Sequence, residues 1–267
     1  MSNPGDILDL TNQVAVVTGA GSGIGQASAQ LLADAGATVI CADIDVTSAG
    51  RTANAIADAG GSAQPVALDV TSREEFERVV ANARAEHGRL DVMANIAGII
   101  ATNRILDTPE DEFDRVLATN LKGVFLGCQA AARFMTEQGS GSIINMSSGA
   151  IDTPREGLVS YAVAKAGVAQ LTKTLAVEVG PYGVRANAIA PGFILTPMTS
   201  RHFTAPDGTV NEELKEATIA PMRDVQVLQK TGAPSDIAYA VLYLASDASS
   251  FMTGQILRPN GGVSMPW

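Results

Sequence analysis

Short apolar runs alternate with longer amphipathic or alanine-rich segments along most of the chain. The first apolar run, residues 14–18, is followed by a glycine-rich turn at 19–25 and by a helical pattern that reaches Gly36. Further strand-like runs follow at residues 37–43, 66–70, 90–96, 142–147 and 184–190. Because these runs are almost continuously apolar and helices separate them, the pattern predicts an α/β fold with a parallel sheet covered on both faces.

Length and composition fit one folded unit. The chain has 267 residues, of which 46% are hydrophobic and 17% are charged. A chain of this size can bury one sizeable core, and α/β folds of this length commonly form one domain. We therefore expect a single domain over residues 1–267, with an irregular substrate-loop segment at about 193–230.

The charge balance narrows the kinds of partner. A net charge of -10 and a pI near 4.6 disfavour nucleic acids and anionic membranes. No run of 18 apolar residues is present, and residues 1–11 lack the pattern of a secretion signal. Cys41 and Cys128 lie in apolar stretches without a partner motif, which favours buried, reduced thiols and no metal site. We expect a cytoplasmic protein with a small-molecule ligand and no membrane or nucleic-acid partner.

A tyrosine and a lysine four residues apart offer candidate proton-transfer chemistry. Tyr161 and Lys165 fall in an alanine-rich helical pattern that would place both on one helix face. A lysine about 4 Å away, at an effective dielectric of about 20, would lower the pKa of a tyrosine by roughly three units. The pair is therefore either an ordinary surface contact or a tyrosine whose pKa suits proton transfer near neutrality.

The glycine-rich turn after the first strand predicts a phosphate-binding site. Gly19, Gly23 and Gly25 would allow a tight turn and a close approach of a pyrophosphate to the N-terminus of the following helix. This spacing differs from the general G-x-G-x-x-G pattern, and such a turn can be purely structural. Asp43, at the end of the second predicted strand, could accept hydrogen bonds from the adenosine ribose hydroxyls. Turn and carboxylate together predict a dinucleotide site.

These motifs occur in an order that resembles the short-chain dehydrogenase/reductase family over residues 14–262. Residues 18–25 resemble the family's T-G-x-x-x-G-x-G turn. The stretch 95–98 resembles N-N-A-G with Ile96 in place of the second Asn, and residues 191–196 resemble P-G-x-x-x-T. The resemblance implies a single doubly wound Rossmann-type domain, with a seven-stranded parallel sheet in the order 3-2-1-4-5-6-7 and helices on both faces.

The resemblance also implies a catalytic set of Asn120, Ser148, Tyr161 and Lys165. Ser148 is preferred to Ser147 because it lies thirteen residues before Tyr161. Tyr161 would exchange the proton of an alcohol as hydride passes between the same carbon and a nicotinamide. Ser148 would hold the substrate oxygen, Lys165 would lower the pKa of Tyr161 and bind the nicotinamide ribose, and Asn120 would fix a water on a proton path.

Two further groups of residues are expected around this set. The expected cofactor-binding residues are Gly19, Ser22, Gly23, Ile24, Gly25, Asp43, Asp69, Val70, Asn95, Ala97, Gly98, Tyr161, Lys165, Pro191, Gly192, Ile194 and Thr196. The expected substrate-binding residues are Ser148, Ala150, Ile151, Leu158, Tyr161, Phe193, Met198 and His202. The second group is mostly apolar, which favours a small hydrophobic or alicyclic secondary alcohol or ketone over a sugar.

The residues around the second strand favour NAD over NADP. Ser22 occupies the turn position where related NADP enzymes carry Arg or Lys, and residues 42–45 (Ala-Asp-Ile-Asp) contain two acids and no base. An Asp43 carboxylate about 4 Å from a 2′-phosphate would cost roughly 4 kcal/mol per phosphate charge at a dielectric near 20. We therefore expect NAD(H) as the cofactor.

Two rival functions and an assembly are also considered. A 3-oxoacyl-[acyl-carrier-protein] reductase-like enzyme would need a basic docking patch, but residues 137–139 and Val177 add no positive charge beside Arg133. A non-catalytic nucleotide sensor would be expected to lack a catalytic group, and none is missing. The resemblance implies a homotetramer, in which we expect the tail 263–267, ending in Trp267, to pack at a subunit interface.

Overall fold

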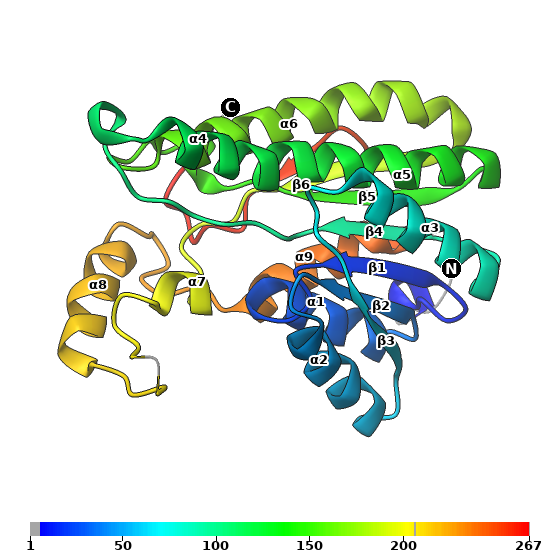
Figure 1. Ribbon diagram of the computed structural model, residues 1–267, viewed down its shortest axis with the longest axis horizontal. Helices are drawn as coiled ribbons and strands as arrows, with labels where there is room; N and C mark the ends of the chain where they lie inside the picture. Colours follow the sequence, from blue (N-terminus) through cyan, green and yellow to red (C-terminus); the bar gives the residue numbers. More distant parts are fainter. Residues whose placement is uncertain (1–5, 206, 267) are drawn as a thin grey trace.

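The computed structural model describes residues 6–205 and 207–266 and is built around one parallel sheet (Figure 1). Its strand order is β3-β2-β1-β4-β5-β6-β7, which confirms the predicted topology. The strands are β1 (Val14–Thr18), β2 (Thr38–Asp43), β3 (Ser62–Ala67), β4 (Val92–Asn95), β5 (Gly141–Met146), β6 (Val184–Ile189) and β7 (Ile256–Leu257).

Helices cover both faces of this sheet. They are α1 (Gly23–Asp34), α2 (Val46–Asp58), α3 (Arg73–His87), α4 (Glu110–Leu117), α5 (Gly123–Gln138), α6 (Val159–Val179), α7 (Pro197–Ser200), α8 (Glu212–Asp224) and α9 (Pro234–Ala245). Figure 1 shows α4, α5 and α6 on one side of the sheet and α1, α2 and α9 on the other. Shorter helical turns occur at η1 (Asp6–Leu8), η2 (Ile105–Asp107), η3 (Ala118–Lys122), η4 (Gly149–Ile151), η5 (Gly180–Tyr182) and η6 (Asp247–Ser249).

The continuous apolar runs follow from this three-layer arrangement. Along β1, Val14 and Val16 pack into the core on the α3–α5–α6 face. Ala15 and Val17 pack into the core on the α1–α2–α9 face. Because successive side chains point to opposite faces, a strand covered on both sides must be apolar at every position.

The third strand begins and ends earlier in the chain than the hydrophobic pattern predicts. It spans Ser62–Ala67 rather than 66–70, and its register pairs Pro65 with Cys41 of β2. β3 is an edge strand, and all of its residues are exposed or half-buried. A half-exposed edge strand needs no apolar run and tolerates a proline, so the hydrophobic pattern identified only its last two residues.

The two cysteines, the helices and the C-terminal residue bear on further expectations from the sequence. Cys41 and Cys128 are buried free thiols, as predicted, and burial raises the pKa of each to about 12. No helix within residues 6–205 and 207–266 is long and apolar enough to span a membrane. Trp267, which we expected at a subunit interface, lies outside the described residues.

The carboxyl ends of the strands point toward one region of the molecule. The glycine turn follows β1, Asp43 ends β2, and Ser147 and Ser148 follow β5. Figure 1 shows α7 and α8 projecting from this end of the molecule as a separate arm. Open α/β sheets bind their ligands at this end, so a functional site is expected here.

Candidate active site

The glycine turn between β1 and α1 packs tightly against its neighbours. Gly19 has a φ of +69°, and a Cβ there would lie 2.9 Å from the Cα of Ala97. A Cβ on Gly25 would lie 2.1 Å from the carbonyl oxygen of Gly19, so the first turn of α1 could not pack on the loop. These glycines bring backbone N–H groups and the N-terminus of α1 to the surface of a cleft, which suits a phosphate group.

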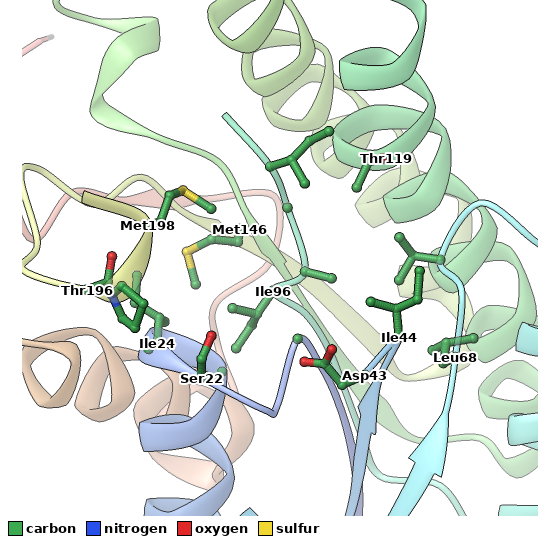
Figure 2. Close-up of a pocket in the computed structure, with 18 of the residues that line it drawn as sticks. Ser22, Ile24, Asp43, Ile44, Leu68, Ile96, Thr119, Met146, Thr196 and Met198 are labelled. Carbon is green, nitrogen blue, oxygen red and sulfur yellow. The ribbon is translucent and has the colours of Figure 1, made fainter. Parts of the chain in front are cut away.

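Asp43 is tied to this turn by hydrogen bonds. Its Oδ2 accepts from the backbone N–H of Gly21 (2.9 Å) and its Oδ1 accepts from that of Asp45 (3.0 Å). Figure 2 shows the carboxylate at the floor of the cleft, beside the turn that carries Ser22. Each carboxylate oxygen has a second lone pair, so both can still accept a hydrogen bond from a ligand hydroxyl.

The cleft has a volume of about 370 Å³ and is lined by most of the predicted cofactor residues. The exceptions are Asn95, Pro191, Gly192 and Ile194. One wall of the cleft is apolar and was not predicted from the sequence; it is formed by Ile44, Leu68, Ile96, Ile99 and Met146, several of which Figure 2 labels. Apolar walls with a carboxylate at one end and a glycine turn at its side fit a nicotinamide dinucleotide.

Asn95 lies in the core rather than at the cleft. It is 2% exposed, and its Nδ2 donates to Oδ1 of Asn145 on the neighbouring strand (2.9 Å). The pairing joins β4 to β5, so the role of Asn95 is to support the sheet. Pro191, Gly192 and Ile194 instead line the adjacent pocket described below.

Tyr161 and Lys165 share one face of α6, as the four-residue spacing predicts. Lys165 is 3% exposed, and its Nζ donates to the carbonyl oxygen of Met146 at the end of β5 (2.8 Å). The Nζ atom lies 5.7 Å from the centroid of the Tyr161 ring. Both side chains line the cleft, so a phenol and a buried amine meet at one point of it.

The two serines after β5 point in different directions. Ser147 is buried, and its Oγ donates to the backbone carbonyl of Lys165 (2.9 Å). Ser148 precedes the η4 turn, its Oγ accepts from the N–H of Ala150 (3.2 Å), and it lines the same pocket as Tyr161, whose pKa it lowers. Ser148 is therefore the serine that faces the reactive region.

Asn120 lies in the π-helical turn η3 between α4 and α5 and is fully buried. Its Oδ1 accepts from the N–H of Ile99 and its Nδ2 donates to the carbonyl of the same residue, both at 2.8 Å. A Cβ on Gly98 would lie 3.0 Å from Asn120 Oδ1 and 3.5 Å from Lys165 Nζ. The amide of Asn120 thus fixes the segment after β4 beside Lys165, while its role in a proton path stays a prediction.

The electrostatics differ from the expected lowering of the Tyr161 pKa by Lys165. Burial raises the pKa of Tyr161, and its hydrogen bond with Ser148 opposes this shift only in part. Burial also lowers the pKa of Lys165 from 10.5 to about 8. The expectation failed because burial destabilises the charged phenolate, while the Lys165 Nζ donates to the Met146 carbonyl and lies 5.7 Å from the centroid of the Tyr161 ring.

A second pocket of about 160 Å³ adjoins the cleft, and Tyr161 and Met198 line both. The predicted substrate residues Ser148, Ala150, Leu158 and Phe193 also line it.

Ile151 and His202, two further predicted substrate residues, do not line this pocket. Residue 202 follows the end of α7, where the chain turns outward, and its Nε2 accepts from Nε of Arg201 at the surface (3.3 Å).

Several residues of the second pocket were not predicted. Met222 and Gln226 come from the end of α8 and the loop after it, Val263 comes from the C-terminal segment, and Thr153 follows the η4 turn. Met222 and Gln226 lie in the predicted substrate-loop segment 193–230, but no local motif marks the individual positions, and Met222, Gln226 and Val263 reach Ser148 only through the folding of distant segments. The hydrophobic pattern therefore carried no signal that could have found them.

Comparison with known proteins assigns the family. A family model described as Enoyl-(Acyl carrier protein) reductase matches residues 19–264. The chain belongs to the short-chain dehydrogenase/reductase family, as its motifs predicted. This family comprises oxidoreductases that bind a nicotinamide dinucleotide, and the relatives of this chain act on CH-OH groups.

Similar proteins span nearly the whole chain. It is 37% identical to a 3-oxoacyl-[acyl-carrier-protein] reductase of Thermotoga maritima, over 95% of this chain and 98% of that one. It is 35% identical to an NAD-dependent glycerol dehydrogenase of Listeria innocua, over 96% of each chain. The structure of a short-chain dehydrogenase/reductase from Mycobacterium marinum is similar with a TM-score of 0.88 and 35% identity, over 98% of this chain and 99% of that one.

Proposed function

We propose that this protein transfers a hydride between NAD(H) and a small, largely apolar or alicyclic secondary alcohol or ketone. The observation that carries the proposal is the position of Tyr161, which lines both the cofactor cleft and the second pocket beside Ser148. A substrate held there would place its oxygen at the hydroxyl groups and its reacting carbon toward the cleft. Both pockets lie at the strand ends of the same sheet, which supports one catalytic domain.

The side chains divide the proton chemistry among them. Ser148 holds the substrate oxygen by a hydrogen bond, and Tyr161 takes the alcohol proton in oxidation or returns it in reduction. Lys165, when protonated, stabilises the phenolate that results, and Asn120 keeps the segment beside Lys165 in place. A bound nicotinamide dinucleotide would accept or supply the hydride at its ring.

The preference for NAD over NADP rests on charge around Asp43. The carboxylate stays beside the turn, and Ser22 contributes no positive charge there. The first cation after β2 is Arg51, whose Nη2 donates to Oγ of Ser48 (2.6 Å), in a cluster that also contains Asp45. The Asp43 carboxylate, with no cation in the turn itself, supports a ribose with free hydroxyls rather than a 2′-phosphate.

A 3-oxoacyl-[acyl-carrier-protein] reductase is the second candidate, favoured by the similarity to the Thermotoga maritima enzyme. The charges on the surface around Arg133 do not favour binding of an acyl carrier protein. Arg133 is paired with Glu77 (3.5 Å), Arg84 is paired with Glu137 (3.1 Å), and Val177 is exposed. Cations countered by acids offer little attraction to an acidic carrier protein.

A substrate and cofactor screen tests the proposal. Secondary alcohols and ketones are offered with NAD(H) or NADP(H), and cofactor absorbance is followed; a 3-oxoacyl group is offered both on its carrier protein and as a small thioester. We expect turnover of small secondary alcohols or ketones with NAD(H). Turnover of the carrier-bound substrate far above all small ketones would instead establish the second candidate.

We also propose a homotetrameric, cytoplasmic enzyme. Helices α5 and α6 expose Phe125, Val163 and Val177, and near the C-terminal strand Tyr239 and Phe251 are exposed. Two separate apolar faces of this kind would support two different two-fold contacts. Light scattering after size-exclusion chromatography measures the assembly, and a monomer would contradict it.

A further inference from the structure

The pocket beside Ser148 and Tyr161 contains polar side chains that the proposed reaction does not use. Arg155 and Gln226 both line it, one from the loop before α6 and one from the loop after α8. The rest of the wall includes apolar side chains such as Leu158 and Phe193. Thr153 and Thr199 line the pocket as well, but only Arg155 carries a charge and only Gln226 an amide, which indicates that a ligand carries a group matching these two.

Gln226 is a largely buried residue in the wall of the pocket. The residue is 4% exposed, and within residues 6–205 and 207–266 no hydrogen bond uses its side-chain oxygen or nitrogen. Gly261 packs directly on it, since a Cβ there would lie 2.3 Å from Gln226 Oε1. The amide atoms of Gln226 are not sealed from solvent in the way that Ser28 Oγ and Asn95 Oδ1 are, so the amide keeps hydrogen-bonding capacity at the pocket that a ligand can use.

Arg155 presents an unneutralised guanidinium to the same pocket. Its Nη1 lies 2.5 Å from Sδ of Met222, and a thioether is only a weak acceptor. The two acids on the same loop are engaged elsewhere: Asp152 binds Arg258 (2.6 Å) and Glu156 binds Arg104 (2.5 Å). No carboxylate of the described residues lies within 4.0 Å of Arg155. Its charge and most of its donors therefore remain available.

We propose that Arg155 and Gln226 bind a carboxylate of the substrate, which makes the substrates of this enzyme hydroxy acids and keto acids with a hydrocarbon body. This inference rests on the proposed function and names the substrate class of the same site. A guanidinium pairs with a carboxylate through two parallel hydrogen bonds, and the amide N–H groups can add another. One arginine matches the single charge of a carboxylate better than the higher charge of a phosphate monoester.

The negative net charge of the protein means that an anionic substrate needs a local positive charge in order to bind. At a net charge of -10, an anionic substrate is repelled over most of the surface. A local cation at the pocket is therefore required to hold an acid, whereas a neutral ketone would need none. The apolar side chains between the polar groups and Ser148 would hold the hydrocarbon part.

The test compares matched acids and esters. Levulinate and a set of oxocyclohexanecarboxylates are reduced with NADH beside their methyl esters, which keep the ketone and remove the charge. We expect kcat/KM of the unmodified protein to be about ten- to hundredfold higher for the best acid than for its ester, as a charge-assisted hydrogen bond would give. Equal values, or a preference for the esters, would overturn the inference.

Substitutions assign the preference to particular side chains. Arg155→Gln should raise KM for the acid about tenfold or more and leave the ester unchanged. Gln226→Leu should raise KM for the acid by a smaller factor. Arg223→Gln is the matched control, because it removes one positive charge from the same arm, where Arg223 is paired with Glu216 (2.9 Å) and does not line the pocket. An equal loss in the control would assign the effect to overall charge and overturn the inference.

A binding measurement separates this inference from the proposed function. The acids and esters are titrated calorimetrically into the protein saturated with NADH, with and without Arg155→Gln. Acid binding that depends on Arg155 but leads to no reduction would support the inference and refute the proposed reaction. Reduction of esters and acids alike, with binding indifferent to Arg155, would support the reaction and refute the inference.

Discussion

The cofactor cleft and the second pocket meet at Tyr161 and Met198, but they are built from different kinds of structural element. The cleft is lined mainly by the ends of β1, β2, β4 and β5 and by the turn before α1, whose positions follow from the sheet, with residues of η3, α6 and the start of α7 completing it. The second pocket is formed by the η4 loop, the arm of α7 and α8, and the C-terminal segment. The difference indicates that the sheet fixes how the cofactor is held, while separate loops determine which substrate is accepted.

Removing the hydroxyl shared by both pockets should have the largest effect. Tyr161→Phe keeps the ring and its packing but removes the group that exchanges the proton. We expect turnover to fall by about 10²- to 10⁴-fold, with NADH affinity nearly unchanged. Stopped-flow turnover and fluorescence titration with NADH measure the two effects. Near-normal turnover would refute the role of Tyr161.

Asp43→Ala changes the cleft alone. The unmodified protein should prefer NAD(H) over NADP(H) by at least about a hundredfold in kcat/KM, because the Asp43 carboxylate repels a 2′-phosphate. The variant should bind NAD more weakly and narrow that gap, without changing the relative order of substrates. If the unmodified protein uses both cofactors equally, the interpretation of Asp43 is wrong.

Lys165→Met should increase the free energy of unfolding, because the buried lysine of the cleft destabilises the folded protein. Burial lowers the Lys165 pKa from 10.5 to about 8, which corresponds to about 3 kcal/mol of lost folding stability at pH 7. The bond to Met146 offsets part of this, so we expect the variant to be more stable by about 2 kcal/mol at pH 7 in urea unfolding.

The gain should depend on pH in one direction. Above pH 8 the folded chain releases the Lys165 proton while the unfolded chain keeps it up to pH 10.5, so the unmodified protein gains stability as pH rises through this window. The advantage of the variant should therefore shrink between pH 8 and pH 10.5. Lys173→Met, an exposed lysine on the same helix, is the control. An unchanged difference across this pH range would contradict the assignment.

Arg258→Met should affect the second pocket alone, by the smallest factor. Arg258 holds Asp152, in the loop that follows Ser148, with Nε to Oδ2 at 2.6 Å. Without this pair we expect KM for the substrate to rise about three- to tenfold while NADH affinity stays constant. Arg258→Lys, which keeps the charge, should recover part of the loss. A parallel loss of NADH affinity would show that the two pockets are not independent.

The sequence was informative where function depends on a local pattern. Each predicted feature lies within one short element. The glycine turn joins β1 to α1, Asp43 ends β2, and Tyr161 and Lys165 lie four residues apart on α6. Such spacings determine geometry directly, so the structure brings all these residues to the cleft.

Three failures have a common physical reason. The edge strand β3 was placed too late, Asn95 was placed at the cofactor, and the Tyr161 pKa was expected to fall. Each depends on burial or on contacts with distant segments, which no local pattern contains. Gln226 and Met222 lie in the predicted substrate-loop segment 193–230 but were not named individually, because they reach the pocket only through the path of α8.

The edges of the sheet determine how copies of this chain can meet. At one edge, β3 carries Pro65, which has no N–H to offer to an incoming strand. At the other edge, β7 contains only two residues. Neither edge can readily template the growth of a continuous intermolecular sheet. These two edges therefore protect copies of the protein from aggregation by strand addition.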